Sequence, residues 1–540
     1  MPDQHVGRAP AAQQLPKPGT GRRTAERPMT GEEYLASLRD GREVWIYGER
    51  VEDVTTHPAF HNSARTLAWL YDALHDPSAQ DTLTTDTDSG GTFTHPFFRA
   101  PRGTDDLRAA RDAIAAWQRM TYGWMGRTPD YKASFLATLG GDPDCYAPFA
   151  ENARHWYARA QNRVLFLSHA LVNPPVSRHT APGQGPGICV RVEDDTDAGI
   201  VVSGAKGVAT GAALTQYAFV GHTGPGPDDP ALAVSFIAPM NTPGLKVICR
   251  ASYEKQAGRT GSPFDYPLSS RFDENDALLV FDHALIPWSN VLIHRDIDRA
   301  GAFAHRSGFL PRFLFHSAVR MSVKLDFLCG LLLKAVHSNG SDVHRAVQSG
   351  VGEALAWRHT VHALVTAMTE RTEPWAGEYV HPHLHPCFAY RVLAPTAYST
   401  VKQLIERLVA SPLIGLTSHA DDFRAPELRP YLDTYLRGAD GTGSEQRVKL
   451  MKLVWDSVGS EFASRHELYE SLHAANPEVT RFETYRSASR TGLRDELCDL
   501  VDTCMSDYDT GGWTVPYLRA RDGRQEPMAD RPRRQCRPAE

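Results

Sequence analysis

The sequence predicts an α+β protein made of three consecutive blocks, the first helical, the second rich in strands and the third helical again. In residues 29–180, apolar side chains recur at helical spacing and include several large aromatic residues. From Gly187 to His294 the pattern changes to short β-branched runs separated by Gly, Pro and Asp. Helical spacing returns after Arg299. The order of these blocks is what predicts the fold class.

Within each block, the expected elements follow from the apolar runs and the turn residues between them. We expect strands at Ile188–Val192, Ile200–Val202, Tyr217–Val220, Leu232–Ile237, Leu245–Cys249 and Leu278–Phe281. We expect long helices in the last block near 308–338, 342–370, 394–411 and 445–474. Residues 1–28 and 519–540 lack apolar periodicity and are expected to be disordered tails. The expected domains are therefore 29–180, 181–298 and 299–518.

Composition is typical of a large enzyme and argues against several other classes of protein. The chain has 540 residues, of which 41% are hydrophobic, so it can bury a large core. A net charge of −6 gives no reason to expect a nucleic-acid partner. The most apolar run, Leu325–Val336, is too short to cross a membrane, and Ala9–Arg27 has no apolar segment of the secretory kind. Eight scattered cysteines indicate reduced thiols and a cytoplasmic location.

One short stretch combines a guanidinium, a phenol and an imidazole. We expect a helix over Leu107–Trp124 that stops at Gly126, followed by a new helix with Thr128 as its N-cap and Pro129 as its first residue. Arg127 and Tyr131 would then flank a helix N-terminus, where free N–H groups favour negative charge such as a phenolate. His169 follows thirty-eight residues later in a second segment expected to be helical.

Each of these side chains also has an ordinary structural interpretation. An arginine beside a helix start is most often a solvated charge, and a tyrosine there is most often a packing residue. A histidine in an apolar run such as Val164–Leu167 is commonly a hydrogen-bonded core residue. The local pattern by itself leaves both interpretations open.

Six separate segments, in the same order, resemble the 4-hydroxyphenylacetate 3-monooxygenase family, the oxygenase half of two-component flavin hydroxylases. These segments are MTGEEYLASLRDGREVWIYGERVEDVTTHPAF from residue 29, GWMGRTPDY at 123–131, SHALVNP at 168–174, SPFDYPLSSR at 262–271, FDHALIPWSNV at 281–291 and SEFASRHELYE at 460–470. The resemblance implies an acyl-CoA dehydrogenase-like fold, with an N-terminal helical block, a central antiparallel β-barrel-like domain and a C-terminal four-helix bundle.

The resemblance also implies an activity, which is ortho-hydroxylation of a phenol by O2 and reduced FAD through a flavin C4a-hydroperoxide, with FMN as an alternative flavin. At the positions of Arg127, Tyr131 and His169 the family surrounds the phenolic oxygen of the substrate. His169 would act as the acid or base, Arg127 would stabilise a phenolate and Tyr131 would donate a further hydrogen bond. His222 and Thr223 match a loop over the substrate, although relatives more often have Ser-Thr there. Flavin contacts are implied for Pro175, Val176, Ser177, Arg178, Thr210, Asn476 and Pro477.

The source of reduced flavin is predicted from a missing motif. The sequence contains no strand–GxGxxG–helix unit with a downstream acid, so a separate NAD(P)H-dependent reductase is expected to supply reduced flavin by diffusion. A rival in the same fold is a flavin-dependent dehydratase or dehydrogenase acting on an acyl thioester. The dehydratase requires an iron–sulfur cluster, but this chain has no cysteine before Cys145.

Two further patterns are expected to carry no metal or disulfide. His381, His383 and His385 could suggest zinc or copper, but they lie in what the sequence predicts to be a long connecting loop, and the family needs no metal. Cys498 and Cys504 are six residues apart on a predicted helix and therefore face different directions.

The substrate and the assembly rest on resemblance alone. Family members act on 4-hydroxyphenylacetate, tyrosine derivatives, chlorinated phenols or carrier-tethered phenols. The terminal extensions and His222 favour a specialised, secondary-metabolic phenol. Relatives form tetramers, which implies a homotetramer in which a neighbour closes the flavin site.

Overall fold

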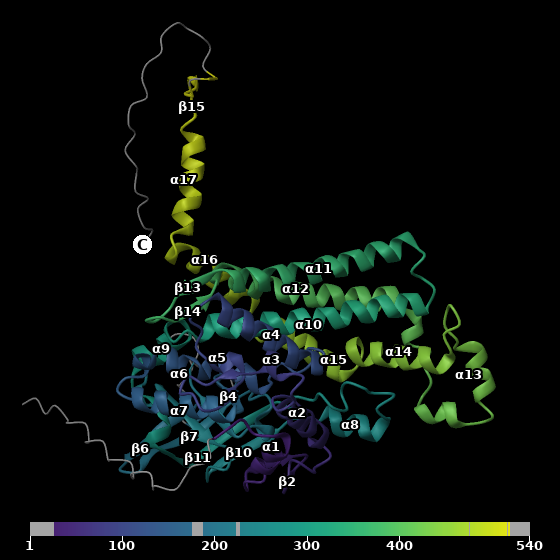
Figure 1. Cartoon of the computed structure of the whole chain (residues 1–540), viewed down its shortest axis with the longest axis horizontal. Helices are drawn as coiled ribbons and strands as arrows, with labels where there is room; N and C mark the ends of the chain where they lie inside the picture. Colours follow the sequence, from purple (N-terminus) through teal and green to yellow (C-terminus); the bar gives the residue numbers. More distant parts are fainter. Residues whose placement is uncertain (1–25, 175–186, 223–226, 475, 516, 519–540) are drawn as a thin grey trace, which may run out of the picture.

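The structure is a computed structural model that describes residues 26–174, 187–222, 227–474, 476–515 and 517–518. Helices and strands follow the expected order of helical, strand-rich and helical blocks (Figure 1). Among the described residues, no helix is long and apolar enough to cross a membrane.

The first block is a set of helices that also contributes strands to the central sheets. Its helices are α1 Gly31–Ser37, α2 His61–Ala73, α3 Gln80–Leu83, α4 Thr104–Met120, α5 Pro129–Leu136, α6 Thr138–Gly141 and α7 Ala150–Arg163. Its strands are β1 Glu43–Ile46, β2 Glu49–Val51, β3 Thr85–Asp86, β4 Phe93–Thr94 and β5 Leu167–Ala170. Thr30 and Glu33 form a reciprocal capping box that begins α1.

The strand-rich block forms two sheets with strands from the first block. Its strands are β6 Arg191–Thr196, β7 Gly199–Lys206, β8 Tyr217–Val220, β9 Val234–Pro239, β10 Leu245–Cys249, β11 Ala277–Pro287 and β12 Val291–His294, with α8 Tyr253–Thr260 between β10 and β11. One sheet has the order β2-β1-β10-β11-β7-β6 and the other β12-β9-β8-β5. Pairing is antiparallel except for β1 with β10 and β5 with β8. In the described part of the chain these sheets stay open and do not close into a barrel.

Two of the predicted strands, Tyr217–Val220 and Leu245–Cys249, coincide with β8 and β10. Because β1 pairs with β10 and β5 pairs with β8, the sheets cross the expected limit at 180, and the domain limits at 180 and 298 stay a prediction.

The C-terminal block is a bundle of long helices. After α9 Ile297–Arg306 come α10 Phe309–Ser338, α11 Arg345–Glu370, α12 Leu384–Val409, α13 Arg429–Tyr435, α14 Ser444–Val458 and α15 Glu461–Leu472. Helices α10, α11 and α12 pack on one another, while α14 and α15 continue end to end along the same bundle (Figure 1). The buried apolar face of α10 supplies much of the core between the bundle and the first block.

Two predicted features of this block are wrong in detail. The expected helix 445–474 is broken after Val458, and Ser460 begins α15 by accepting a hydrogen bond of 3.1 Å from the Ala463 N–H. The segment expected to be a long loop forms the hairpin β13 Thr372–Pro374 and β14 Val380–Pro382 and then enters α12 at Leu384. Pro386 does not prevent this because it lies in the first turn, where its missing N–H is not needed.

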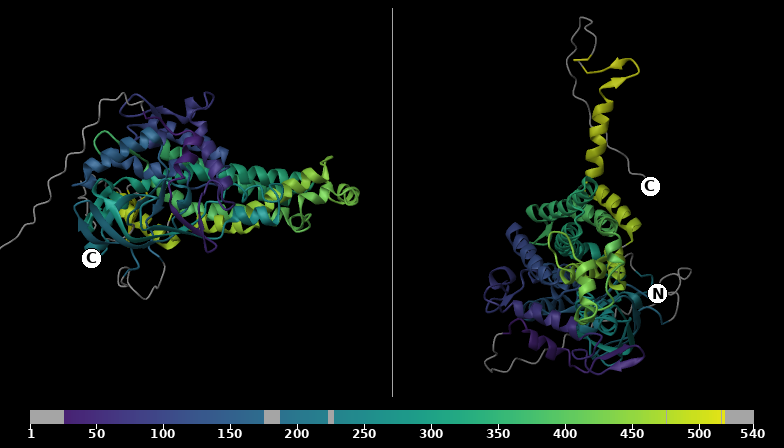
Figure 2. Two further views of the ribbon diagram at one scale, coloured as in Figure 1. Left: turned by 90° about the horizontal axis from the view of Figure 1, so that it is seen from below. Right: turned by 90° about the vertical axis from the view of Figure 1, so that its right-hand side faces the viewer.

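The chain leaves the bundle through α16 Pro477–Arg490 and α17 Leu493–Met505, followed by the small hairpin β15 Tyr508–Asp509 and β16 Gly512–Trp513. Helix α17 projects away from the body, and this is visible in two orthogonal views (Figures 1 and 2). It has no buried residue.

Candidate functional site

The site begins at the turn between α4 and α5. Helix α4 ends at Met120, four residues before the predicted Trp124, so Gly126 is not its stop signal. The chain reverses at Tyr122 and Gly123, which both have positive φ. A side chain at Gly123 would approach the Lys324 backbone nitrogen to 2.7 Å, so the turn packs closely on α10. Gly126 instead leaves room for the hydroxyl of Tyr469 on α15.

Helix α5 begins as the sequence predicts. Thr128 occupies the N-cap position with extended backbone angles, Pro129 is the first helical residue and Tyr131 the third. The Thr128 hydroxyl makes no capping bond and instead accepts a 3.0 Å hydrogen bond from the Gln118 side-chain amide. A side-chain hydrogen bond therefore joins the residue just before α5 to α4.

Arg127 lies between two phenol rings. Its Nη1 donates a 2.6 Å hydrogen bond to Tyr469 Oη, and its guanidinium carbon lies 3.9 Å from the centroid of the Tyr131 ring. Its backbone N–H donates to the Glu274 carboxylate. Burial lowers the pKa of Arg127, but Tyr131, Tyr469 and Glu274 outweigh this effect and raise it above its ordinary value. Arg127 is therefore a permanent cation held on the side of the site where two phenols meet.

Tyr131 presents a buried hydroxyl with unused hydrogen-bonding capacity. The residue is 2% exposed, and its Oη has no hydrogen-bond partner among the described residues. Burial raises the pKa of the phenol well above its ordinary value, although Arg127 acts in the opposite direction. Tyr131 thus stays protonated and can donate a hydrogen bond to a ligand oxygen.

His169 lies on a strand, which corrects the prediction that it belongs to a helix. Residues Leu167–Ala170 form β5, and His169 pairs in register with Phe219 of the parallel strand β8. The apolar run around His169 is so short that its periodicity cannot distinguish a strand from a helix. Pairing with β8, which lies fifty positions later in the sequence, makes this segment a strand. The ring centroids of His169 and Tyr131 are 5.8 Å apart.

The environment of His169 keeps its ring neutral. Burial, Lys132 and Arg127 together lower the pKa of His169 well below its ordinary value. Its Nδ1 forms a hydrogen bond with Lys132 Nζ. The structure therefore brings together Arg127, Tyr131 and His169, the three residues expected to surround a phenolic oxygen.

The sequence interpretation missed the residues that α15 brings to the site. Arg465, Tyr469 and His473 follow one another at four-residue spacing, which places them on one face of the helix. Tyr469 bonds Arg127 and stacks on His473, with ring centroids 4.9 Å apart. This spacing was visible within and just after the segment SEFASRHELYE and could have identified the face.

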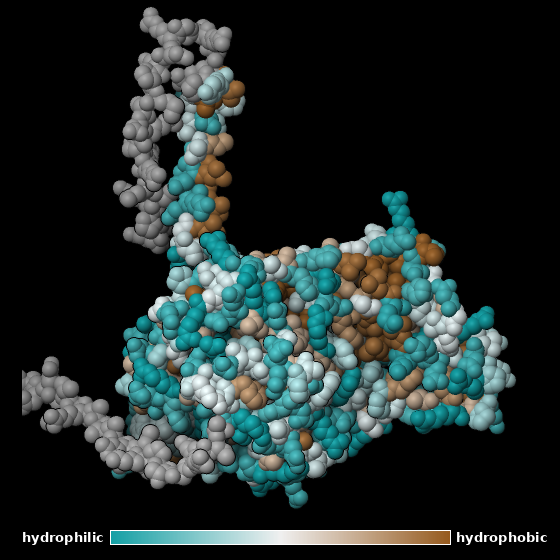
Figure 3. Space-filling model, viewed as in Figure 1, coloured by the Kyte–Doolittle hydropathy of each residue, from teal (hydrophilic) through white to brown (hydrophobic). Residues whose placement is uncertain are grey.

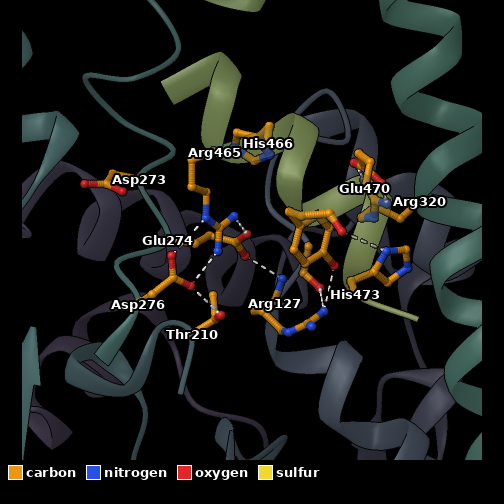
Figure 4. A network of polar contacts seen from close by, with 12 residues as sticks. Arg127, Thr210, Asp273, Glu274, Asp276, Arg320, Arg465, His466, Glu470 and His473 are labelled. Atoms are coloured by element: carbon orange, nitrogen blue, oxygen red, sulfur yellow. Dashed lines mark hydrogen bonds and ion pairs between the residues drawn. The ribbon is translucent and has the colours of Figure 1, made fainter. Parts of the chain in front are cut away.

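A buried ionic cluster locks α15 against α10. Both oxygens of Glu470 accept hydrogen bonds from Arg320, one at 2.7 Å and the other at 2.5 Å, and Lys324 donates at 2.8 Å. These three side chains are at most 1% exposed. Because both cations lie on α10, the cluster fixes the rotation of α15 and hence the direction of Tyr469. Figure 4 shows Arg320 beside Glu470.

A second cluster lies on the other side of Arg127 (Figure 4). Arg465 binds the Asp276 carboxylate through two hydrogen bonds of 3.0 and 2.7 Å. Thr210, expected to contact flavin, donates its hydroxyl hydrogen to Asp276 Oδ1 at 2.6 Å. With its hydrogen committed, Thr210 presents only lone pairs and can accept from a ring N–H, which fits a flavin.

The other residues expected to bind flavin or substrate are less defined. Asn476 caps α16 by accepting a 2.9 Å hydrogen bond from the Glu478 N–H, and Pro477 is the first residue of that helix. Pro477 lines a cavity of about 220 Å³ together with His473 and Glu470. His222 comes two residues after the end of β8, with Gly221 between them. Residues 175–178 and Thr223 lie outside the described residues.

The three histidines of the β14–α12 segment point to no shared site. His381 stacks on Trp375 at 4.7 Å, while the rings of His383 and His385 are 5.3 Å apart. In the parts of the chain that the structure describes, no group of three or more His, Cys, Asp or Glu side chains is arranged to hold a metal ion.

Comparison with known proteins places this chain in a family. The model of the 4-hydroxyphenylacetate 3-hydroxylase N-terminal region matches residues 30–293, and that of the C-terminal region matches residues 300–502. The chain belongs to the 4-hydroxyphenylacetate 3-hydroxylase family. This family assignment agrees with the resemblance seen in the sequence.

Relatives of the whole chain include proteins with different phenolic substrates. The 4-hydroxyphenylacetate 3-monooxygenase oxygenase component of Escherichia coli is 50% identical over 513 residues, which covers 94% of this chain and 98% of that protein. The (3S)-3-amino-3-(3-chloro-4-hydroxyphenyl)propanoyl-[peptidyl-carrier protein SgcC2] monooxygenase of Streptomyces globisporus is 50% identical, over 92% of this chain and 94% of that protein.

Solved structures agree with the predicted fold class. An oxygenase component of 4-hydroxyphenylacetate 3-monooxygenase, in complex with FAD and 4-hydroxyphenylacetate, superimposes with a TM-score of 0.80 at 32% identity, over 87% of this chain and 100% of that one. An archaeal 4-hydroxybutyryl-CoA dehydratase shares the fold, with a TM-score of 0.76 at 20% identity. The predicted fold class, with helical, strand-rich and helical blocks, is thereby confirmed.

Proposed function

We propose that this protein is the oxygenase component of a two-component, reduced-flavin-dependent monooxygenase that hydroxylates a phenol ortho to its hydroxyl group. The observation that carries the proposal is the convergence of Arg127, Tyr131 and His169. These residues lie close together and supply a permanent cation, an unused phenol donor and a neutral imidazole. The identity to phenol monooxygenases supports this reaction over the acyl-thioester alternative.

Each of the three side chains has a separate role in activating a phenol. A phenolate pushes more electron density onto its ortho carbon than a neutral phenol does, so the site must remove the phenol proton and hold the resulting charge. Neutral His169 can accept the proton, and Arg127 can stabilise the anion. Tyr131, which keeps its own proton, can donate to the same oxygen.

FAD is the cofactor that the family structures support. When bound and reduced, FAD supplies from O2 the oxygen atom that enters the ring. We assign its binding to Thr210, to residues 175–178 and to the Asn476–Pro477 turn at the start of α16. Thr210 supports this assignment because it donates its hydroxyl hydrogen to Asp276 and keeps its lone pairs free to accept a hydrogen bond. A separate reductase supplies the reduced flavin.

The substrate is, in this proposal, a specialised phenol carrying a polar or carrier-tethered tail. The Streptomyces globisporus relative, whose name specifies a carrier-bound phenol, is as similar to this chain as the Escherichia coli relative that is named for a free acid. We assign recognition of the tail to His222 and to Thr223, the next residue in the sequence. His222 comes two residues after the end of β8, which pairs with the strand that carries His169.

We propose that the protein works as a homo-oligomer, with a tetramer as the expected state. Support comes from α17, whose Leu497, Leu500, Val501 and Met505 are each more than half exposed and form an apolar stripe (Figure 3). Burying this stripe on a second copy would stabilise the amphipathic helix, because none of its residues is buried against the described part of the chain.

The reaction is tested by mixing anaerobic protein and reduced FAD with oxygenated buffer, with and without a panel of free and carrier-bound phenols. We expect one phenol to yield its catechol with nearly one product per flavin consumed and little hydrogen peroxide. Oxidation of flavin as fast as in free solution, with peroxide as its product for every phenol, would overturn the proposal.

A further inference from the structure

Lys132, the residue after Tyr131, is buried in a way that is unusual for lysine. It is 0% exposed, and among the described residues no carboxylate lies within ion-pair distance of it. Lys324 provides a contrast in the same protein. It is equally buried and also lies beside a histidine, His466, but it has Glu470 at 2.8 Å. Burying an ammonium without a counter-ion costs free energy. This cost favours the neutral amine form of Lys132.

Among the described residues, the Lys132 amine is surrounded mainly by aromatic rings. Its Nζ lies 5.3 Å from the ring centroid of Tyr131, 5.6 Å from that of Phe219 and 5.7 Å from that of Phe309. The exception is Nδ1 of His169, which shares a hydrogen bond with Nζ. Three ring faces can stabilise an ammonium once a proton arrives.

The charged and titratable groups that face this amine come from few elements. Tyr131 lies on the same helix, Arg127 precedes that helix and His169 lies on β5, whereas β8 and α10 present Phe219 and Phe309. Burial, followed by Arg127, lowers the pKa of Lys132 well below its ordinary value. Both partners of the Lys132–His169 hydrogen bond are therefore poised to be neutral before substrate binds.

We propose that Lys132 is a positioning residue that takes up, through His169, the proton that the substrate phenol loses. The inference rests on the proposed phenol hydroxylation. In the resting pair, His169 Nδ1–H donates to the lone pair of Lys132 Nζ, so Nε2 presents its own lone pair to the phenol. When the phenol O–H bond breaks, its proton forms the Nε2–H bond, and the Nδ1 proton passes to Nζ.

The products of this transfer are a phenolate, a neutral His169 in its other tautomer and a Lys132 ammonium among the three rings. No group is oxidised or reduced, and the proton stays inside the protein. A phenol bound in this way ionises without releasing a proton to solvent. That property separates the relay from an imidazole that simply hydrogen-bonds the substrate.

The test uses the full-length protein as purified and 4-nitrophenol, whose neutral and ionised forms differ in visible absorption. Titrations are run in weak buffer with a pH indicator, at a pH where the free dye is protonated. We expect wild-type protein to bind the dye as its phenolate without releasing a proton. In Lys132→Met, which lacks the acceptor, the bound phenolate should fall at least about tenfold, while neutral dye still binds.

Lys132→Arg serves as the matched control because it keeps a cation but cannot take up a proton. It should bind phenolate only while releasing one proton per dye. The relay would be overturned if the wild-type protein released a proton on binding the dye, or if Lys132→Met bound as much phenolate as the wild type. The measurement of proton release uses the wild-type protein and so does not depend on the folding of a variant. If either result occurs while the protein still binds the dye and hydroxylates its phenol, the relay is wrong and the proposed function stands. Failure of the wild-type protein to bind the dye would count against the phenol site itself, and so against the relay that depends on it.

Discussion

Arg127 Nη1 donates a 2.6 Å hydrogen bond to Tyr469 Oη, and this contact joins residues 342 positions apart in the chain. Tyr469 is held in turn by its neighbour Glu470, whose carboxylate is bound by Arg320 and Lys324 of α10. The direction of the guanidinium in the candidate site therefore depends on how the C-terminal bundle packs.

Tyr469→Phe should weaken phenol binding about three- to tenfold, because the guanidinium of Arg127 loses the acceptor that aims it and one net hydrogen bond is lost. Equilibrium titration with a bound phenol measures the effect. Tyr485→Phe is the control, since Tyr485 is 61% exposed on α16. Equal losses in the two variants would show that Tyr469 has no special role.

His169→Ala should leave FAD binding intact but lower the yield of hydroxylated product per flavin by about 10²–10⁴-fold, the usual contribution of a positioned acid or base. Product and hydrogen peroxide are quantified in the same single-turnover reaction. His337→Ala removes an exposed histidine at the end of α10 and should give the wild-type yield of hydroxylated product per flavin. Full coupling in His169→Ala would exclude His169 from proton transfer.

The pH dependence follows from the lowered pKa of His169. Since burial, Lys132 and Arg127 hold this pKa well below its ordinary value, His169 stays neutral between about pH 8 and 6, and its contribution to phenol binding should be constant there. The unfolded chain takes up the proton more readily, so His169 costs stability as pH falls below about 6.5. The melting temperature of His169→Ala relative to wild type should therefore rise on acidification; a constant difference would contradict the lowered pKa.

Glu470→Gln should destabilise the protein by about 3–5 kcal/mol, because it leaves two buried cations without their carboxylate. Denaturant unfolding measures the change. Asp421→Asn, which breaks the exposed pair of Asp421 with Arg424, should cost at most about 1 kcal/mol. A similar small cost for both would mean that the buried cluster does not hold α15.

Leu500→Asp should reduce the mass of the particle in solution, since it places a charge in the apolar stripe of α17. Light scattering coupled to size-exclusion chromatography measures this mass. Asp499→Ala, on the same exposed helix, is the control and should leave the mass unchanged. An unchanged mass in Leu500→Asp would remove α17 from the proposed interface.

Local sequence signals predicted much of the fold. The order of the three blocks, the strands at Tyr217–Val220 and Leu245–Cys249 and the start of α5 at Pro129 all depend on short-range patterns. Turn residues, β-branched runs and N-terminal proline act within a few positions, so they can be recognised without knowing the partners. The nearness of Arg127 and Tyr131 follows from the same local geometry.

The sequence by itself thus determined the class of fold and the family, and it identified the three residues that we expect to surround a phenol. Only the tertiary structure decided that His169 lies on a strand, because β5 is stabilised by pairing with β8 rather than by its own pattern. It also decided that Tyr469 aims Arg127 and that Lys132 turns toward His169. These contacts join segments far apart in the chain, where burial and long-range hydrogen bonding outweigh local preference.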